Sequence, residues 1–515
     1  MLHNARFNIA LHVVCTMIAV VFTCGPASGA EGRALSAAVI RGATSYSQLQ
    51  LLAAYQPALG QPITQANAQS IITAIESLYL RDGYSQPELQ LDASQAQFGI
   101  LGIDVFEARI SQVEFTGDAG GYRAQLDSLA GELRALQSLR PRSLQDVLRR
   151  MSALPGLKVG VKSRRDPAFR NAYVIAVDTH FSPLEGSLRQ TNRGTRDVGP
   201  GFLIGQLTAN GLGGIDLKSG LLLGIATDTQ EFRGGGMFVD APLGYRDTRL
   251  NVLGFRSASQ PTEHPQDIGL YYLHDRATAG VTHRWRIRGS VDVTSTGTFE
   301  VDDLLISGGG AQLQEDRLRV LDLSTQLYWQ GDNAVQYVSV LTLRQGFNAL
   351  GAGLQTGGVD DPLRQGGFSS WRVQFVRVQR FMDAWQLRID ALGQFSDDVL
   401  ADRERFKIGG DRLGRGFEVP ALAGDRGIGA KLELKRKLPR LQSSFGDLSL
   451  YGSYDIGVTS ANDAHSRQSG ATAAIGAGLE GKRLGGYLEL ARPLTHPDVD
   501  GRRRTVVFFD LTATF

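Results

Sequence analysis

Cysteine is nearly absent from this sequence. Its 515 residues include only Cys15 and Cys24, and both precede residue 25. If this N-terminal region is removed on export, the mature chain has no thiol. That would exclude disulfide bonds and thiolate metal sites from the mature protein.

The N-terminus has the pattern of an export signal. Arg6 provides a positive charge and Ile9–Phe22 is largely apolar, with Ser28 and Ala30 at the −3 and −1 positions of a cleavage site. The apolar run is shorter than the roughly 20 residues needed to span a bilayer. We therefore expect residues 1–30 to be a cleaved signal peptide.

Excess charge of one sign is also missing. Lys and Arg number 54 against 52 Asp and Glu, so the formal charge is +2 and gives no reason to expect a nucleic-acid partner. Beyond the signal, no run is long and apolar enough for a membrane helix. If the mature protein lies in a membrane, it must do so as a closed β-barrel, because only a barrel leaves no strand backbone unpaired in lipid.

Residues 31–185 read as mixed α and β structure. A short segment, 31–43, precedes two modules at 44–118 and 119–185. The first contains a helix at Ala66–Arg81 with apolar residues at helical spacing, and the second contains one around Leu144–Met151. Short strand-like runs follow each helix, so we expect two small α+β domains.

Residues 186–515 lose the helical period and alternate between polar and apolar residues instead. Alternation is clearest at Trp285–Val293, Trp385–Ala391, Lys431–Lys435 and Asp447–Asp455. A soluble β-sandwich also alternates, but here charged residues occur in mid-strand on one face. That placement fits a transmembrane barrel with an apolar exterior and a wet lumen, and the length allows about sixteen strands.

The chain ends on an apolar strand that finishes with an aromatic residue. Phe509, Leu511 and Phe515 share one face of this segment. As a free edge it would invite aggregation, whereas as the closing strand of a barrel it would be paired on both sides. The pattern also resembles the C-terminal signal by which barrel-assembly machinery recognises outer-membrane barrels.

Several further stretches carry a family resemblance. In the first module these are Leu59–Thr64, Arg81–Tyr84 and Gly99–Leu101, and in the second Leu144–Arg149 and Leu154–Gly156. With the barrel segments Thr191–Gly199 and Asn210–Asp216, their order resembles that of two-partner secretion transporters (TpsB type). These belong to the superfamily of POTRA-plus-barrel proteins that includes BamA.

The resemblance has implications for function. It implies an outer-membrane pore whose two POTRA domains lie in the periplasm and bind an unfolded exoprotein, of adhesin or haemolysin type, through its N-terminal secretion domain. Outer-membrane lipid would surround the barrel, and the barrel-assembly machinery would act during biogenesis. The family often has an N-terminal helix that plugs the pore. Here only Glu31–Ala43 precedes the first module, so we expect a short plug or none.

The sharpest motif lies late in the barrel, at Arg415-Gly416-Phe417. In the family a long loop folds back into the lumen and presents Val-Arg-Gly-Phe/Tyr at its tip; here Gly414 replaces the Val. The family pairs this Arg with an Asp-x-Gly motif on the inner wall, which Asp455 and Gly457 match. Alternation independently turns Asp455 toward the lumen, and we predict that Arg415 and Asp455 form a charge-assisted pair.

The resemblance also directs attention to how the exoprotein is recognised. An unfolded chain can add a strand to an exposed sheet edge. The candidate edge in the second module is the strand containing Ala172, Tyr173, Val174, Ile175, Ala176 and Val177.

The sequence contains no recognisable catalytic motif. Gly476–Gly481 fits G-x-G-x-x-G, but no helix pattern follows it, so a hairpin turn is the better interpretation. There is no nucleotide-binding P-loop, no nucleophile with a credible base and no histidine pair at metal-ligand spacing. We therefore expect no enzyme activity, no cofactor and no metal. The alternatives are an outer-membrane protein or autotransporter assembly factor of the same superfamily, a plain porin, or a surface hydrolase.

Overall fold

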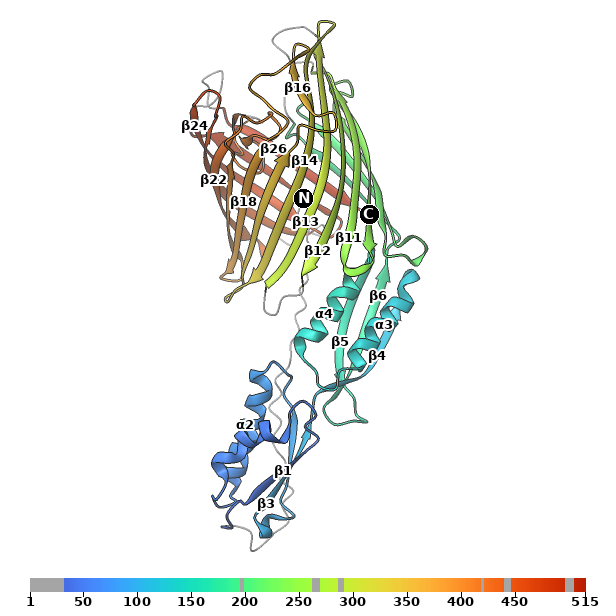
Figure 1. Ribbon diagram of the computed structural model, residues 1–515, viewed down its shortest axis with the longest axis vertical. Coiled ribbons are helices and arrows are strands. Elements are labelled where there is room, and N and C mark those ends of the chain that lie inside the picture. Colours follow the sequence, from blue (N-terminus) through green and yellow to red (C-terminus); the bar gives the residue numbers. More distant parts are fainter. Residues whose placement is uncertain are drawn as a thin grey trace. The chain divides into compact units, whose positions relative to one another are not determined.

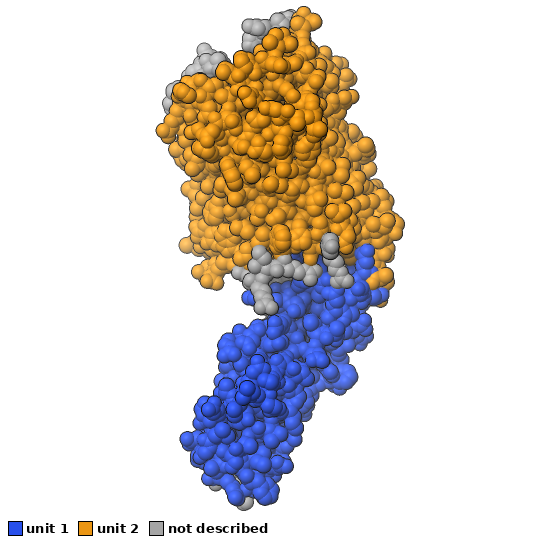
Figure 2. All heavy atoms as spheres, viewed as in Figure 1, with its two compact units in different colours: residues 1–116, 125–151, 159–178 blue, residues 117–124, 152–158, 179–515 orange. Residues whose placement is uncertain are grey.

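The computed structural model describes residues 32–194, 199–261, 269–285, 291–417, 421–439, 446–495 and 504–515 (Figure 1). The predicted signal peptide, with Cys15 and Cys24, lies outside these residues. Two compact units are distinguished in Figure 2. One comprises residues 1–116, 125–151 and 159–178, and the other 117–124, 152–158 and 179–515.

The first module has a three-stranded sheet with two helices. It contains β1 (Ala37–Arg41), α1 (Gln48–Tyr55), α2 (Gln65–Arg81), β2 (Glu88–Asp92) and β3 (Ile100–Phe106). Its sheet has the order β1-β3-β2, with β1 parallel to β3. Strand β1 therefore belongs to this sheet, although the sequence analysis assigned residues 31–43 to a preceding segment.

Helix α2 packs on this sheet through one face. Ile71, Ile75 and Tyr79 are each at most 1 % exposed, as their helical spacing predicts. Tyr79 donates a 2.6 Å hydrogen bond to the buried carboxylate of Glu107, which also accepts a 2.9 Å bond from the Ser45 N–H. Burial and the bond to Glu107 raise the pKa of Tyr79, so this tyrosine remains a donor and ties the helix to the end of the sheet.

The second module repeats the plan. It contains β4 (Arg109–Gly117), α3 (Arg123–Arg134), α4 (Pro141–Ser152), β5 (Leu157–Arg165) and β6 (Ala172–Phe181). Helix α4 buries Leu144, Val147, Leu148 and Met151.

Short 3₁₀ helices η1 (Gln56–Ala58), η2 (Ala96–Phe98), η3 (Gly120–Tyr122) and η4 (Leu212–Gly214) occupy connections along the chain.

Sheet order in this module corrects one prediction. The order is β4-β6-β5, so β6 lies between two partners. Residues Ala172–Val177 are in this central strand, where the backbone already pairs on both sides. They cannot accept an added strand, and the edges of the sheet are β4 and β5.

The rest of the chain forms a closed antiparallel barrel of sixteen strands, all within the described residues. The strands, in chain order, are β7 (Leu184–Thr191), β8 (Phe202–Asn210), β9 (Lys218–Ala226), β10 (Phe232–Leu243), β11 (Tyr245–Ser259), β12 (Tyr271–Trp285), β13 (Val291–Gly308), β14 (Ala311–Gln330), β15 (Val335–Gly346), β18 (Ser369–Phe381), β19 (Trp385–Phe395), β22 (Arg426–Lys437), β23 (Asp447–Ser460), β24 (Arg467–Glu480), β25 (Leu484–Pro493) and β26 (Val506–Thr514). A short hairpin of β16 (Gly353–Thr356) and β17 (Val359–Asp360) pairs with the end of β14. Among the described residues, no helix is long and apolar enough to cross a bilayer.

Strand β26 closes the barrel. It pairs with β25 on one side and with β7 on the other, where Leu511 lies opposite Gln190. The chain end is held as well, because Phe515 and Gly186 exchange backbone hydrogen bonds of 2.9 and 3.0 Å. Leu511 and Phe515 are 44 % and 78 % exposed on the outer surface.

Alternation separates the two faces of the wall. On β22, Ile428 and Leu432 are 63 % and 48 % exposed, whereas Lys431 between them is 8 % exposed. Apolar side chains thus face lipid and charged ones face the lumen. The predicted alternating stretch Trp285–Val293 spans two strands: β12 ends at Trp285, β13 begins at Val291, and residues 286–290 lie outside the described part of the chain.

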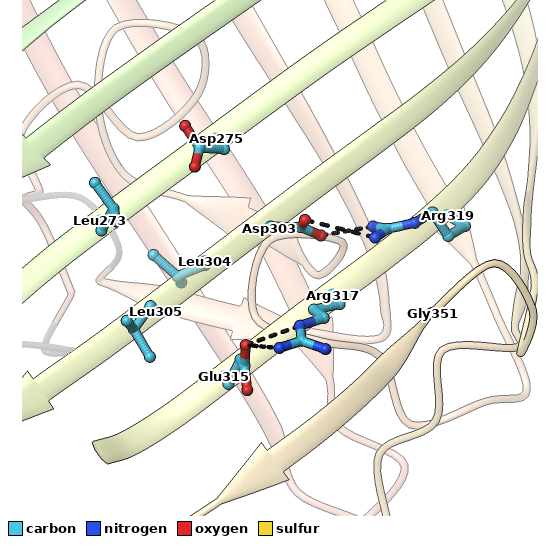
Figure 3. A pocket seen from close by; sticks show the side chains of 9 residues that line it. All are labelled: Leu273, Asp275, Asp303, Leu304, Leu305, Glu315, Arg317, Arg319 and Gly351. Carbon is cyan, nitrogen blue, oxygen red and sulfur yellow. Dashed lines mark hydrogen bonds and ion pairs between the residues drawn. The ribbon is translucent and has the colours of Figure 1, made fainter. Parts of the chain in front are cut away.

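Outward-facing side chains mark the limits of the lipid band. Near one end of β14, Trp329 stacks on Tyr337 with ring centroids 4.9 Å apart. Toward the other end, Figure 3 shows a pocket where Arg319 pairs with Asp303 and Arg317 with Glu315, at 2.5 and 2.8 Å. The stretch from Arg319 to Trp329 matches the roughly 9–11 residues with which a tilted strand crosses a bilayer.

Candidate functional site: the inner loop

The connection between β19 and β22, residues 396–425, is called the inner loop here, and its described parts, 396–417 and 421–425, lie against the inside of the wall. It contains a small hairpin of β20 (Phe406–Ile408) and β21 (Leu422–Gly424). A compact apolar cluster fixes the hairpin and the tip to each other. The members of this cluster are Phe406, Ile408, Leu413, Phe417 and Leu422.

Glycines in the wall make room for this cluster. A Cβ atom at Gly457 would stand 2.7 Å from Ile408 Cδ1, and one at Gly470 would stand 2.7 Å from Phe417 Cε2. Both distances are far below ordinary van der Waals contact. Gly457, predicted as part of the lumen-wall motif, therefore lies at a position where the packed inner loop leaves no room for a side chain.

The tip of the inner loop is Gly414–Phe417. Its backbone meets Asp455, whose Oδ2 accepts bonds from the N–H groups of Gly414 (2.8 Å) and Arg415 (3.0 Å). Gly414 has φ +80°, a left-handed conformation that strains any residue with a Cβ, and most of all a β-branched one such as valine. Phe417 is 1 % exposed, so the glycine that replaces the family's Val leaves an ordered tip with its apolar contact intact.

The guanidinium of Arg415 has a different partner from the one predicted. Its Nη1 lies 2.7 Å from Glu489 Oε2 on β25, and its Nη2 lies 2.8 Å from Glu433 Oε2 on β22. The predicted side-chain pair with Asp455 is therefore wrong. Asp455 accepts hydrogen bonds from backbone N–H groups of the tip, while the longer Arg415 side chain extends beyond Asp455 to Glu433 and Glu489.

Glu489 is a shared counter-charge that the sequence analysis missed. Its side chain is 0 % exposed and forms an ion pair with Arg193 as well as with Arg415. The Tyr451 hydroxyl donates to it at 2.9 Å, and the Arg193 guanidinium lies 4.0 Å from the centroid of the Phe508 ring. The sequence does indicate that Glu489 faces the lumen, because it is an acidic residue between Leu488 and Leu490 in an alternating strand.

A second ionic contact holds the stem of the inner loop. The carboxylate of Glu404 accepts bonds from Arg344 Nε and Nη2 (2.9 and 2.8 Å) and from Arg372 Nη2 (2.7 Å). Next to it, Arg403 pairs with Asp302 on β13. Tip and stem thus attach to different sectors of the wall, β22–β25 and β13–β18, so the inner loop extends across part of the lumen.

The predicted site residues thus have different placements. Arg415, Gly416, Phe417, Asp455 and Gly457 come together at the tip of the inner loop. Phe509 and Leu511 lie on the closing strand and Phe515 directly follows it. Residues Ala172–Val177 lie in the central strand of the second module.

Comparison with known proteins accords with this architecture. Residues 34–108 match the ShlB-type POTRA domain, and residues 305–481 match the haemolysin secretion/activation proteins ShlB/FhaC/HecB. The outer membrane transporter CdiB of Escherichia coli O6:K15:H31 is 23 % identical over 516 residues, covering 95 % of this chain and 84 % of that protein. These matches indicate a two-partner secretion transporter.

Solved structures of transporters show the same fold. CdiB from Escherichia coli superposes with a TM-score of 0.76 at 20 % identity, over 96 % of this chain and 93 % of that one. CdiB from Acinetobacter baumannii gives 0.64 at 14 % identity, over 94 % and 90 %. BamA from Haemophilus ducreyi lacking POTRA domains 1–3 gives 0.53 at 10 % identity, over 91 % and 98 %, so the assembly-factor alternative has less support. This transporter is an outer-membrane protein whose POTRA domains lie in the periplasm.

The tip geometry makes a prediction for Gly416. A Cβ here would lie 2.7 Å from the carbonyl carbon of Arg492 and 2.9 Å from Pro493 N, both backbone atoms that cannot move aside. Gly416→Ala is expected to displace the tip from β25 and reduce secretion by about tenfold, which corresponds to a cost of about 1.4 kcal/mol. The measurement is the amount of exported protein at equal barrel abundance.

The matched control is Gly205→Ala. Gly205 lies in strand β8, where a Cβ would meet no atom within 4 Å. This variant should secrete as the unchanged protein does. Normal secretion by Gly416→Ala would show that the transporter does not depend on the seating of the tip.

Proposed function

We propose that the substrate is a large exoprotein of adhesin or haemolysin type, bound unfolded in the periplasm through an N-terminal secretion domain and threaded through this lumen to the cell surface. The single observation that best supports the proposal is the inner loop. Its tip and stem are held to the lumen wall by ion pairs, which can be exchanged for other polar contacts without breaking the barrel.

Recognition is proposed to occur at a free sheet edge of the second POTRA domain. Strand β5 is an edge strand and directly follows α4. An extended segment could pair with its backbone, while pockets beside the strand would select side chains. Charged residues such as Lys158 and Lys162 limit unspecific pairing at this edge.

Export is proposed to need no nucleotide. The sequence contains no P-loop, so the free energy would come from folding of the exoprotein outside the cell, which prevents its return. The inner loop would have to move away from part of the lumen while the chain passes, then reform its contacts with the wall.

A pair of proline variants tests recognition at β5. Neighbouring residues in a strand point their N–H groups to opposite sides, so Lys162→Pro and Ser163→Pro remove one N–H that faces β6 and one that faces the free edge. We expect one variant to assemble normally yet lose secretion by about tenfold or more. The assay compares exported exoprotein with the amount of heat-modifiable barrel.

The outcomes distinguish edge recognition from export itself. If both variants assemble and secrete normally, β5 is not the recognition edge. If the unchanged transporter exports no large exoprotein of the proposed type, the proposed function is contradicted whatever the variants do.

A further inference from the structure

Strands β8 to β11 carry apolar residues and glycines along part of their inward face as well as apolar residues on their outward face. Their outward positions include Met237 and Val239, which are 66 % and 39 % exposed. The inward position between these two is Phe238, and the next inward positions are Gly236 and Gly234. On β13, by contrast, the inward positions include Glu300 and Asp302.

The strand register confirms that these apolar residues face the lumen. Phe238 lies opposite Gly220 of β9 and Leu253 of β11, and Phe255 lies opposite Gly236. Two positions along β10 from Phe238, on the same face, Asp240 pairs with Arg249. This face is therefore continuous with the charged lining of the lumen.

Phenylalanine rings lie against glycines on this face. A Cβ at Gly220 would be 2.6 Å from Phe238 Cε1, and one at Gly236 would be 2.9 Å from Phe255 Cδ2. At Gly234, rings approach from two sides, with Phe255 Cζ at 3.0 Å and Phe232 Cζ at 3.1 Å. We call these six residues, Gly220, Phe232, Gly234, Gly236, Phe238 and Phe255, the glycine–phenylalanine face.

The arrangement gives a flat apolar surface. Each ring occupies the space that a neighbouring side chain would fill, so it lies along the wall and presents its other side to the lumen. All three rings are only partly buried. Apolar surface that stays in contact with water lacks the roughly 25 cal/mol of stabilisation per Å² that burial would give. An apolar inward face therefore does not add to the stability of a water-filled barrel.

We propose that the glycine–phenylalanine face is the surface along which the unfolded exoprotein slides during export. An unfolded chain exposes the apolar side chains that a folded protein buries. Hydrophobic contacts with the ring faces are non-directional, and the rings form no hydrogen bond that would hold a particular residue. One segment of the exoprotein can therefore replace the next on this face with little change in free energy. This inference rests on the proposed function and adds where in the lumen the substrate passes.

The position of the inner loop supports this path. Its tip is bound to β22, β23 and β25, and its stem to β13, β15 and β18. Strands β8 to β11 lie in the remaining sector of the wall, together with β26 and β7, as the closed strand order requires. A chain passing along them would have the apolar face on one side and the charged loop on the other.

Photo-cross-linking in cells tests the path. The photoreactive residue p-benzoylphenylalanine replaces Phe238 or Phe255, and the exoprotein carries a C-terminal domain that folds before export and stalls the chain in the pore. Both positions should cross-link to the stalled exoprotein. Met237, the lipid-facing neighbour of Phe238, is the matched control and should not.

Each result bears on the proposal. If the unchanged transporter secretes the exoprotein but Phe238 and Phe255 give no cross-link to it, the sliding path is wrong and the proposed function stands. A cross-link from these positions to residues 31–43 of the transporter itself would also contradict the proposal, because the face would then seat a plug. If the unchanged transporter exports nothing, the proposed function fails and this inference with it.

Variants give a second readout. Phe238→Ser with Phe255→Ser should slow secretion by at least about fivefold, since two apolar contacts are lost, while Phe238→Leu with Phe255→Leu should keep most of the rate. Heat-modifiable barrel is measured for every variant so that only assembled protein is compared. A serine variant that assembles and secretes at the normal rate would overturn the proposal.

Discussion

Replacing Glu489 by alanine is expected to reduce secretion by about a hundredfold. Glu489 is fully buried and faces both Arg193 and Arg415, so its loss leaves two cations without their shared carboxylate. Removing one partner of a buried ion pair costs about 3–5 kcal/mol. Because Arg415 is one of the two cations left without this carboxylate, part of that cost destabilises the contact between the tip of the inner loop and the wall. Exported exoprotein is measured at equal amounts of assembled barrel.

The control for Glu489→Ala is Glu480→Ala. Glu480 also forms an ion pair from a barrel strand, with Lys435 at 2.7 Å, but its side chain is 32 % exposed. Surface pairs contribute only about 0–1 kcal/mol, so this variant should secrete almost normally. Equal secretion by the two variants would contradict the role assigned to Glu489.

Replacing Arg415 by alanine is expected to reduce secretion by at least about tenfold. The loss removes the fork that joins Glu433 on β22 to Glu489 on β25, while the two backbone bonds to Asp455 remain. Arg415→Lys should give an intermediate result, because an ammonium group cannot bridge two carboxylates as a planar guanidinium does. Single-channel recordings should show longer or larger open states for both variants.

Arg412 provides the control for Arg415. It lies in the same loop, and its guanidinium donates a 2.8 Å bond to Gln374 in an exposed setting. Arg412→Ala should leave secretion and conductance close to those of the unchanged protein. If Arg415→Ala secretes at the normal rate, the tip contacts are structural only.

Much of the barrel could be predicted from the sequence because alternation is enforced at each position by lipid on one side and water on the other. The α2 helix was predictable for a similar reason, since its apolar residues recur at helical spacing. Helix α1 was not, because Leu51 is its only fully buried side chain and leaves little periodic signal. Strand β1 is five residues long, and its parallel pairing with β3 joins segments far apart in the chain.

The candidate site was predictable in its members and less so in its contacts. Alternation and the family motif placed Arg415 and Asp455 together in the lumen. Neither could show that the Arg415 side chain extends beyond Asp455, because that depends on where the tip backbone sits. Arg193 and Glu489 are almost 300 positions apart and meet only because the barrel closes. The central position of β6 likewise depends on sheet order, which strand patterns do not encode.

The most direct measurement is translocation by the purified transporter in liposomes, without nucleotide or other proteins. Unfolded exoprotein is supplied on the POTRA side, and protease is added after incubation. We expect protease-protected exoprotein inside the vesicles, and strongly reduced protection with Glu489→Ala. Vesicles that pass small solutes through the barrel but protect no exoprotein would contradict the claim that this pore exports a protein.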